Sequence, residues 1–413
     1  MTIAVETARI ALLGCGTVGR ALASLSRTAP SASHPLQITG ALVRDTRTER
    51  PLNLPPLTDD PQLLLRSEPD VLVELLGGIE PARSLILQAL EQRIPVVTAN
   101  KKLLAHHGAE LREAAHRTET PLLYEAAVIA GVPFLATFAR RPRAAAVTAL
   151  SGIVNGTSNF ILTRCDRDRV TVAEALADAQ RRGYAEPNPV DDVDGLDARD
   201  KLALLLQHFA GVAVPATAIE TTGLDAIGDV HAAHARELGG AIKPVVSAAW
   251  NHREVQAFVG PAFVPLSNPL AGVHGVENAI ALQTLGGRVL FQGPGAGPDV
   301  TAATILDDVE EILSGAGRVP DRVKHVSVTA PDTGWLVTIE AAHLPEAADV
   351  ADLLASHSLF AARTTTTRIH EGRKCRSALL WPAGRAVVER ALSALCVAAG
   401  CTASALRALE VEP

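Results

Sequence analysis

The alternation of short apolar runs with helical patterns over residues 9–135 constrains the fold more than any other feature of the sequence. Apolar, β-branched runs such as "RIALLG", "LQITGALV", "PDVLVELL" and "IPVVTA" predict strands. Segments such as "VGRALASLS", "PARSLILQALEQR" and "KLLAHHGAELREAAHR" predict helices between or after those strands. Strands that alternate with helices favour an α/β fold with a parallel, doubly wound sheet.

The turn between the first predicted strand and helix is "GCGTVG", a glycine-rich motif typical of dinucleotide-binding folds. Gly14 permits the tight turn, Gly16 lets a pyrophosphate approach the backbone, and Gly19 lets the helix lie close to the strand. The helix start at Thr17 and Val18 offers unpaired N–H groups to phosphates. The motif therefore predicts a dinucleotide site, and the alternative is a merely tight strand–helix turn.

The end of the second predicted strand bears on the choice between NAD and NADP. An acid there would bind the ribose hydroxyls of NAD, whereas an arginine would suit the 2′-phosphate of NADP. Arg44 follows the apolar run directly and Asp45 comes next, with Arg47 and Arg50 close behind. We favour NADP on this basis and keep NAD open. The alternative is a solvated charged loop with no role in cofactor choice.

Composition excludes several classes of protein. The 413 residues are 47% hydrophobic and carry a net charge of -7, so we expect two or three domains with their own cores. Lys and Arg are scattered and aromatics make up only 3%, which argues against nucleic acid as a partner. No apolar run is long enough for a membrane span, and no signal peptide is evident. Five cysteines without a CxxC pair favour a reduced, cytoplasmic protein and disfavour structural zinc.

The segment "GYAEPNPVDDVDGLDARDK" concentrates carboxylates beside one amine. A helix that begins near Gly195 would place Asp197 and Lys201 four residues apart on one face. Glu186 and Asp192 would come from the loop before that helix. Such a cluster could hold a substrate ammonium, position a hydroxyl and set whether the lysine gives or takes a proton. The alternative is an exposed helix start with favourable acids in its first turn.

A second lysine lies in "TANKKLL", directly after the predicted strand "IPVVTA". Ligands collect at the carboxyl ends of parallel strands in this kind of fold. We therefore expect Lys101 to face the cofactor crevice and Lys102 to face solvent. A basic loop residue without function is the alternative.

The chain resembles homoserine dehydrogenases over most of residues 9–320. The segments "ELLGG", "TANK", "YEAAVIAGVP", "NGTSNFIL" and "GPGAG" occur in the order of that family. Its signature spacing is matched by Ala179, Gly183, Tyr184, Ala185, Asn188, Pro189, Asp192, Val193, Gly195, Asp197 and Lys201. The resemblance implies reversible, NAD(P)-dependent reduction of L-aspartate 4-semialdehyde to L-homoserine, a step toward threonine, isoleucine and methionine.

The resemblance also implies roles for individual residues. Lys201 would lie near the reacting oxygen with Lys101 beside it, and we expect Lys201 to protonate the developing alkoxide. Asp197 would act with the two lysines. Residues that bind or frame the substrate would be Glu186, Asp192, Asp197, Thr157 and Tyr184. From its position before "SNFIL", Thr157 could equally be a helix N-cap.

Further positions carried over from the family concern the cofactor and a cation. Cofactor-binding residues would include Gly77, Gly78, Thr98, Lys101, Gly295 and Gly297; the last two glycines could also be simple turn residues. A sodium-type cation would be held, mostly by backbone carbonyls, at Glu125, Val128, Ala130 and Val132. The alternative for that loop is a buried turn without an ion.

We expect three units: a Rossmann-type NAD(P)-binding domain at 1–135 with a helix at about 298–318, a substrate-binding, catalytic and dimerisation domain at 136–297, and a C-terminal domain at 325–413. The last reads β, α, β, β, α, β, a ferredoxin-like order, which the resemblance identifies as ACT-type. Its ligand-loop position, "AAHLPEAADV", has Pro345 but no following glycine, which argues against threonine binding there. Subunit pairing, as a homodimer or homotetramer, is still expected.

Two other functions compete with this interpretation. One is a different semialdehyde or amino-acid dehydrogenase built on the same nucleotide domain; a phosphorylating type would need a nucleophilic cysteine, and no cysteine has an evident histidine partner. The other is a catalytically silent dinucleotide-binding regulator. The presence of Lys101, Asp197 and Lys201 disfavours that regulator.

Overall fold

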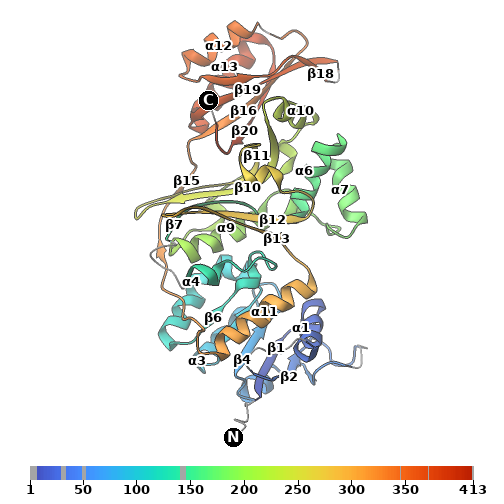
Figure 1. The fold of residues 1–413 in the computed structure, drawn as a ribbon, viewed down its shortest axis with the longest axis vertical. Helices are drawn as coiled ribbons and strands as arrows, with labels where there is room; N and C mark the ends of the chain where they lie inside the picture. Colours follow the sequence, from blue (N-terminus) through green and yellow to red (C-terminus); the bar gives the residue numbers. More distant parts are fainter. Residues whose placement is uncertain are drawn as a thin grey trace.

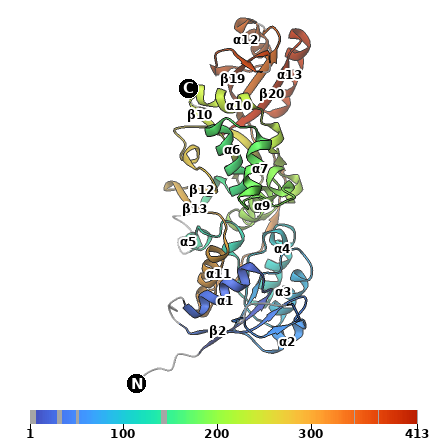
Figure 2. The same cartoon turned by 90° about the vertical axis from the view of Figure 1, so that its right-hand side faces the viewer.

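The computed structural model describes residues 7–28, 34–48, 53–139, 146–344, 346–370 and 372–411. The molecule is elongated, with an N-terminal sheet at one end and a second sheet that runs from the middle to the other end, where helices cover it (Figures 1 and 2). Arg50 and Pro345 lie outside the described residues.

The N-terminal sheet has six parallel strands in the order β3-β2-β1-β4-β5-β6, which is the order of dinucleotide-binding folds. The predicted parallel sheet is thereby confirmed. Its strands are β1 (Ala8–Leu13), β2 (Leu36–Leu42), β3 (Leu57–Thr58), β4 (Val71–Glu74), β5 (Val96–Thr98) and β6 (Leu122–Leu123). Its helices are α1 (Thr17–Thr28), α2 (Pro61–Arg66), α3 (Ala82–Glu91) and α4 (Lys101–Thr118).

Helix α11 (Pro298–Leu313) returns to this N-terminal unit from far along the chain and lies beside α1 (Figure 1). Its buried residues Ala302, Ile305 and Val309 join the core formed by Ile10 and Leu12 of β1. The core of the N-terminal unit is therefore completed by a helix that follows the middle unit in the sequence.

The middle unit is built on antiparallel strands in the order β13-β12-β7-β10-β11. These are β7 (Val147–Ile153), β10 (Gly240–Trp250), β11 (Val255–Pro265), β12 (Glu277–Thr284) and β13 (Gly287–Pro294). Helices around it are α5 (Leu135–Ala139), α6 (Gly156–Asp168), α7 (Val172–Arg181), α8 (Val190–Val193), α9 (Leu196–Phe209) and α10 (Asp229–Glu237). The chain also has the short strands β8 (Val212–Ala213), β9 (Glu220–Thr221), β14 (Lys324–His325) and β15 (Val328–Thr329). Its single turns of 3-10 helix are η1 (Glu125–Ala127), η2 (Ala216–Ala218), η3 (Leu224–Ala226) and η4 (Pro269–Gly272).

The C-terminal unit continues this sheet in the order β20-β16-β19-β17, with β18 also beside β19. Strand β20 pairs with β11 of the middle unit, with Ala262 opposite Arg407 and Phe263 opposite Ala408. A single sheet of twelve strands therefore spans both units. The elements are β16 (Thr333–Ala341), α12 (Ala347–Ser356), β17 (Ala361–Thr364), β18 (Arg368–His370), β19 (Arg373–Ala383), α13 (Arg385–Ala399) and β20 (Thr402–Ala408).

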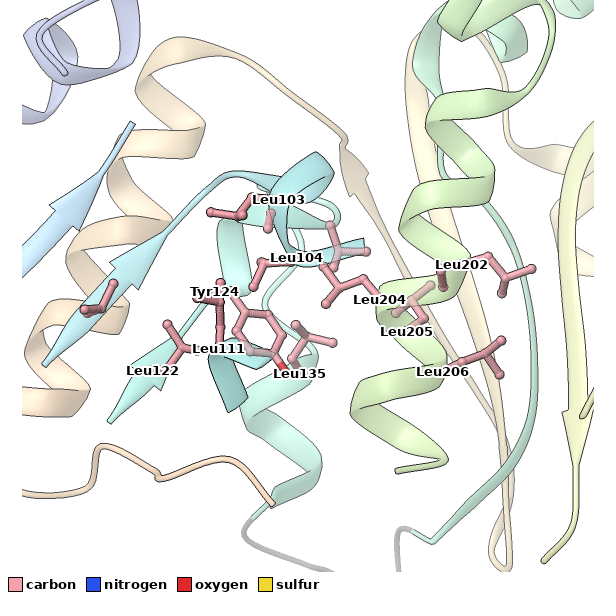
Figure 3. Close-up of a cluster of buried hydrophobic side chains, with 14 of the residues drawn as sticks. Leu103, Leu104, Leu111, Leu122, Tyr124, Leu135, Leu202, Leu204, Leu205 and Leu206 are labelled. Carbon is pink, nitrogen blue, oxygen red and sulfur yellow. The ribbon is translucent and has the colours of Figure 1, made fainter. Parts of the chain in front are cut away.

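The N-terminal and middle units meet through α4 and α9. Figure 3 shows Leu104 of α4 close to Leu204 of α9, and both are buried in one hydrophobic cluster with Leu103 and Leu205. The Gln207 side-chain amide donates a hydrogen bond to the Leu104 carbonyl at 3.2 Å. This contact fixes the two helices that carry the candidate catalytic lysines.

Within the described ranges, none of the helices combines the length and the apolar character that crossing a membrane would require.

Candidate active site

The site begins at the N-terminus of α9, which starts at Leu196 as predicted. Gly195 caps this helix with a φ of 76°, a left-handed conformation that glycine adopts without strain. Asp197 and Lys201 then face the same direction, one turn apart, with Lys201 Nζ 3.0 Å from Asp197 Oδ2. Only 6% of Asp197 and 8% of Lys201 are exposed, so the pair is not a solvated helix start.

Lys101 joins this pair from the other unit. It is the first residue of α4, directly after β5, and its Nζ forms an ion pair with Asp197 Oδ1. Asp197 thus bridges two lysines, one on each of its oxygens. The Lys101 side chain keeps 44% of its surface exposed, which leaves it accessible to solvent. Lys102 is exposed, as expected.

The pKa values of the two lysines are shifted in opposite directions. Burial lowers the pKa of Lys201, and the attraction of Asp197 offsets this only in part. Burial also lowers the pKa of Lys101, but Asp197, helped by Asp192, outweighs that effect and leaves its pKa raised. The carboxyl pKa of Asp197 is lowered because Lys201 and Lys101 together outweigh the effect of burial. Lys201 is therefore the more readily deprotonated amine.

Asn155 holds the carboxylates in place, a role that the sequence analysis did not assign. Its side-chain amide donates to Asp192 Oδ1 at 2.7 Å and to Asp197 Oδ2 at 2.8 Å. Its side-chain oxygen accepts from the Ser158 N–H at 2.8 Å and so caps α6. Lys201 Nζ donates to the neighbouring Val154 carbonyl at 2.6 Å. The one available signal was "VNGTS", an Asn in front of a helix.

The prediction that Thr157 caps α6 is wrong, because Asn155 occupies that position. Thr157 lies inside the first turn, and its hydroxyl donates to the Tyr184 carbonyl at 2.7 Å. This hydrogen bond joins the first turn of α6 to the segment that contains Tyr184. Tyr184 is 43% exposed, with its ring packed on Phe160 at a centroid distance of 5.1 Å.

The two other acids of the segment have different positions. Asp192 belongs to the short helix α8 rather than to a loop. Burial raises the pKa of Asp192, and its hydrogen bond from Asn155 opposes this effect. Glu186 is exposed, and its backbone carbonyl accepts a hydrogen bond from Gln180. Asp192 is thus joined to the cluster through Asn155, whereas Glu186 is exposed and contacts α7 through its main-chain carbonyl.

The glycine-rich turn has the geometry that a dinucleotide requires. A Cβ on Gly14, where φ is 110°, would lie 2.8 Å from the Leu75 carbonyl oxygen, and one on Gly19 would lie 2.7 Å from the Gly14 oxygen. A Cβ on Gly16 would have nothing within 4 Å. Gly14 and Gly19 are therefore needed for packing, while Gly16 leaves an open surface beside the start of α1 at Thr17 and Val18.

The neighbouring strand ends are organised by Glu74, a buried carboxylate that the sequence analysis did not single out. It accepts hydrogen bonds from the Thr98 hydroxyl at 2.6 Å and from the Leu76 N–H at 2.8 Å. Asn100 donates to the Gly78 carbonyl at 2.7 Å. Gly77 and Gly78 both have positive φ and open space around them. The Thr98 hydroxyl is used within the protein rather than left for a ligand.

The remaining residues predicted to bind the cofactor lie just after β2 and between β13 and α11. Arg44 is exposed just beyond the end of β2. A Cβ on Gly295 would collide with the Asn278 side chain at 2.4 Å. Gly297 has a φ of 145° and precedes α11. These glycines are required by local packing and backbone geometry whatever else they contact.

The loop after β6 uses Glu125 as a structural anchor. Its carboxylate accepts backbone N–H groups of Phe134, Leu135 and Ala136 at 2.7–2.9 Å, which caps the start of α5. The Ala130 carbonyl accepts a hydrogen bond from the Thr304 hydroxyl. The Glu125 side chain therefore does not fit as a cation ligand, and among the predicted positions only main-chain oxygens remain suitable.

Comparison with known proteins identifies the family. A family profile for homoserine dehydrogenase matches residues 133–309, and a profile for the NAD-binding domain of homoserine dehydrogenase matches residues 14–125. The homoserine dehydrogenase of Lactococcus lactis subsp. lactis is 37% identical over 318 residues, which is 74% of this chain and 74% of that protein. The chain belongs to the homoserine dehydrogenase family. It is accordingly an NAD(P)-dependent oxidoreductase, as the resemblance implied, and a catalytically silent regulator is not favoured.

Solved structures of homoserine dehydrogenases are similar to all or most of this chain. The homoserine dehydrogenase of Thiobacillus denitrificans superposes with a TM-score of 0.89 at 28% identity, covering 98% of this chain and 99% of that one. A hyperthermophilic archaeal homoserine dehydrogenase in complex with NADPH gives a TM-score of 0.64 at 25% identity, covering 75% of this chain and 98% of that one.

Proposed function

We propose that Lys101, Asp197 and Lys201 form the catalytic centre for the reversible reduction of L-aspartate 4-semialdehyde to L-homoserine. The observation that carries this proposal is the bridging carboxylate of Asp197, which brings an amine from each unit to one point. When bound, the reduced nicotinamide supplies a hydride to the aldehyde carbon. The protein must then stabilise and protonate the alkoxide oxygen that develops.

Lys201 is the proposed proton donor. Its ammonium has three N–H groups, of which one is directed to the Val154 carbonyl and one pairs with Asp197. The third is left for the substrate oxygen. A buried ammonium with a lowered pKa gives up its proton more readily than a solvated one. Lys101, whose pKa is raised, would remain charged and stabilise the alkoxide electrostatically.

Acidic and polar groups around the triad are proposed to hold the amino-acid end of the substrate. Asp192 and Glu186 would attract its ammonium group, while Thr157 and Tyr184 would border the same pocket. Asn155 would act as a positioning residue, since it contacts Asp192 and Asp197 rather than open space.

For the cofactor we propose NADP in preference to NAD. The support is Arg44, exposed beyond the end of β2, where a 2′-phosphate would lie in this strand order. The pyrophosphate would rest on Gly16 and the first turn of α1, and Gly77, Gly78, Thr98, Gly295 and Gly297 would border the rest of the cofactor. R44E should lower the preference for NADP⁺ over NAD⁺ by at least tenfold in kcat/KM; an unchanged ratio would contradict the role of Arg44.

The proposed sodium-type cation would depend on main-chain oxygens only. The main-chain carbonyls of Glu125, Val128 and Val132 are the candidates, because the Glu125 carboxylate and the Ala130 carbonyl already accept hydrogen bonds. No catalytic step depends on this ion. Its test is the thermal midpoint in sodium compared with choline chloride, where equal midpoints would argue against a structural cation.

The C-terminal unit is proposed to be a ferredoxin-like, ACT-type domain that supports subunit pairing, in a homodimer or homotetramer. The support is its order of strands and helices and its sheet order β20-β16-β19-β17. Initial rates in millimolar threonine would show whether it regulates the enzyme. Unchanged rates would argue against threonine control through this unit.

The experiment that tests the proposed reaction is an initial-rate assay of NADPH formation from L-homoserine and NADP⁺. We expect saturable turnover with L-homoserine and none with the D-enantiomer. Turnover of another amino alcohol or hydroxy acid at a higher kcat/KM would instead favour a different dehydrogenase.

A further inference from the structure

Two cysteines lie on either side of the end of helix α13 in the C-terminal unit. Cys396 belongs to the last turn of the helix, and Cys401 follows the helix directly before β20. Gly400 between them has a φ of 59°, a left-handed conformation that ends the helix. At helix ends of this kind the chain turns back, and the residue after the glycine packs on a side chain of the last turn. In α13 these two positions are occupied by Cys401 and Cys396.

Helix α12 of the same unit ends in the same way but with other residues. Ser358 is left-handed with a φ of 61°, and the Leu359 N–H donates to the Leu354 carbonyl at 2.9 Å. Leu354 and Leu359 occupy the positions that correspond to Cys396 and Cys401, and both leucines are buried in the core of the unit. An ordinary apolar pair is therefore enough to pack such a helix end. The two thiols of α13 add a chemical possibility that packing does not require.

Contacts at the end of α13 bring the two sulfur atoms together. The Cys401 thiol donates to the Leu395 carbonyl at 3.7 Å, which places its Sγ over the last turn of the helix. Cys401 belongs to the hydrophobic core of the unit, and Cys396 packs against that core. Both residues are free thiols, and the Cys396 side chain is hydrogen-bonded to Cys401. A disulfide between them would therefore need only a local movement of the two side chains.

The two thiols differ in their access to solvent. Cys401 is only 8% exposed, whereas Cys396 is half-buried and lines a groove of about 350 Å³ between α13 and β20. A small reagent in this groove meets Cys396 first, and Cys401 lies behind it. Burial, followed by the nearness of Cys396, raises the pKa of the Cys401 thiol, and Arg373 opposes this rise. An accessible thiol beside a buried second thiol is the arrangement of an attacking and a resolving cysteine.

We propose that Cys396 and Cys401 form a modification site that reacts with small organic disulfides and closes to an intrachain disulfide. The Cys396 thiolate attacks one sulfur of the reagent, whose S–S bond breaks, and the released thiolate takes up a proton. The Cys401 thiolate then attacks the Cys396 sulfur of the mixed disulfide, and the second half of the reagent leaves as a thiol. The protein loses two hydrogen atoms and the reagent gains them. The new bond ties the end of α13 to the start of β20.

The test is incubation of the reduced full chain with oxidised glutathione, followed by alkylation of the remaining thiols and peptide mass mapping. The wild type should form a disulfide between Cys396 and Cys401 that dithiothreitol reverses. C401S should stop at a mixed disulfide with one glutathione on Cys396, and C396S should form neither product at this site. The matched control is C165S, which removes a thiol that borders a different surface cavity and should leave the reaction as it is in the wild type.

A wild type that keeps both thiols, or that joins either of them to another cysteine, would overturn the proposal. A mixed disulfide that persists on Cys396 of the wild type would show that Cys401 does not resolve it, and the intrachain bond would be wrong. The oxidised wild type should unfold at a thermal midpoint about 2 °C or more above the reduced form, because the bond constrains the unfolded chain. The same treatment should leave the midpoint of C396S unchanged. Equal midpoints for the oxidised and reduced wild type would contradict the claim that the bond ties α13 to β20.

Discussion

At the scale of single residues, the site depends on the Asp197 carboxylate, which contacts both Lys101 and Lys201. Asp197 is almost fully buried and holds an amine on each oxygen, while Asn155 donates to it from a third direction. A buried carboxylate would be costly without such partners. The arrangement keeps two like charges, Lys101 and Lys201, close to one point where a substrate oxygen can be stabilised.

The substitution D197N should shift the pH dependence of homoserine oxidation. The oxidation needs a neutral amine as base, so kcat/KM should rise with pH through the pKa of Lys201, which lies below its ordinary value of 10.5. Asp197 raises that pKa, so its removal should lower it further and move the rise toward lower pH. We also expect a loss of about 10²-fold in kcat/KM at the optimum.

The matched control is D194N, which removes one charge from an exposed position of the same segment. It should leave the pH profile where it is in the wild type. A D197N profile that coincides with the wild-type profile would contradict the assignment of Lys201 as the base.

At the scale of elements, different glycines of the glycine-rich turn serve packing and ligand binding. G14A should lower the free energy of unfolding by about 1–3 kcal/mol, because its Cβ would meet the Leu75 carbonyl in a left-handed conformation. G16A should leave the thermal midpoint near that of the wild type but raise the KM for NADP⁺, since its Cβ would point into open space. Equal loss of stability in both variants would argue against this division.

Elements with a strong local pattern could be predicted from the sequence. Apolar periodicity, glycines and β-branched runs predict three features: the strands of the first sheet, the start of helix α9 near Gly195, and helix α11, which ends at Leu313. The pairing of Asp197 with Lys201 followed from helical spacing alone. Lys101 was placed near the crevice by its position after a parallel strand, but its contact with Asp197 depends on a tertiary interface.

Other features depend on contacts far along the chain and could not be predicted. Helix α10 was not predicted; it directs His231 and His234 to Ser404 and Ser377 of the C-terminal unit. The run "FAARTTTTRI" at residues 360–369 was expected to form one strand of the predicted β, α, β, β, α, β order. It instead contributes to two strands, β17 and β18, with Thr365 between them bonded to Ser377. Asn155 and Thr157 are both residue types that cap helices, so the sequence alone does not show which of them caps α6. In the structure Asn155 is the cap, and its side-chain amide also bonds to Asp192 and Asp197.

At the scale of the whole molecule, the three units are joined by two different kinds of contact. Leucines of α4 and α9 join the first two (Figure 3). The junction to the C-terminal unit combines a hydrophobic cluster, in which Phe263 packs with Leu336 and Leu379, with a buried ion pair. Arg407 of β20, only 4% exposed, bonds to Glu220 at 2.7 and 2.8 Å. Arg407 also lies 4.6 Å from the ring centroid of Trp335.

E220A should destabilise the fold by about 3 kcal/mol, since it leaves a buried guanidinium without its partner. Burial raises the pKa of Glu220, but Arg407 and Arg385 outweigh this and leave it lowered. The wild type should therefore lose this stabilisation as the pH falls below about 4.5 toward the lowered pKa, and E220A should not.

The readout is the thermal midpoint as a function of pH. E91A removes an exposed partner of Arg117 and should leave the midpoint unchanged at every pH. If E220A unfolds at the wild-type midpoint at pH 7, the junction does not depend on this pair.

The most direct test of the catalytic centre is kcat for L-homoserine oxidation in K201A and K101A, with NADPH affinity measured by fluorescence to confirm that each variant folds. We predict that K201A loses 10²- to 10⁴-fold in kcat while it still binds NADPH. K101A should lose less, because it stabilises charge rather than transferring the proton. A K201A enzyme with near-wild-type kcat beside an inactive K101A would contradict the account.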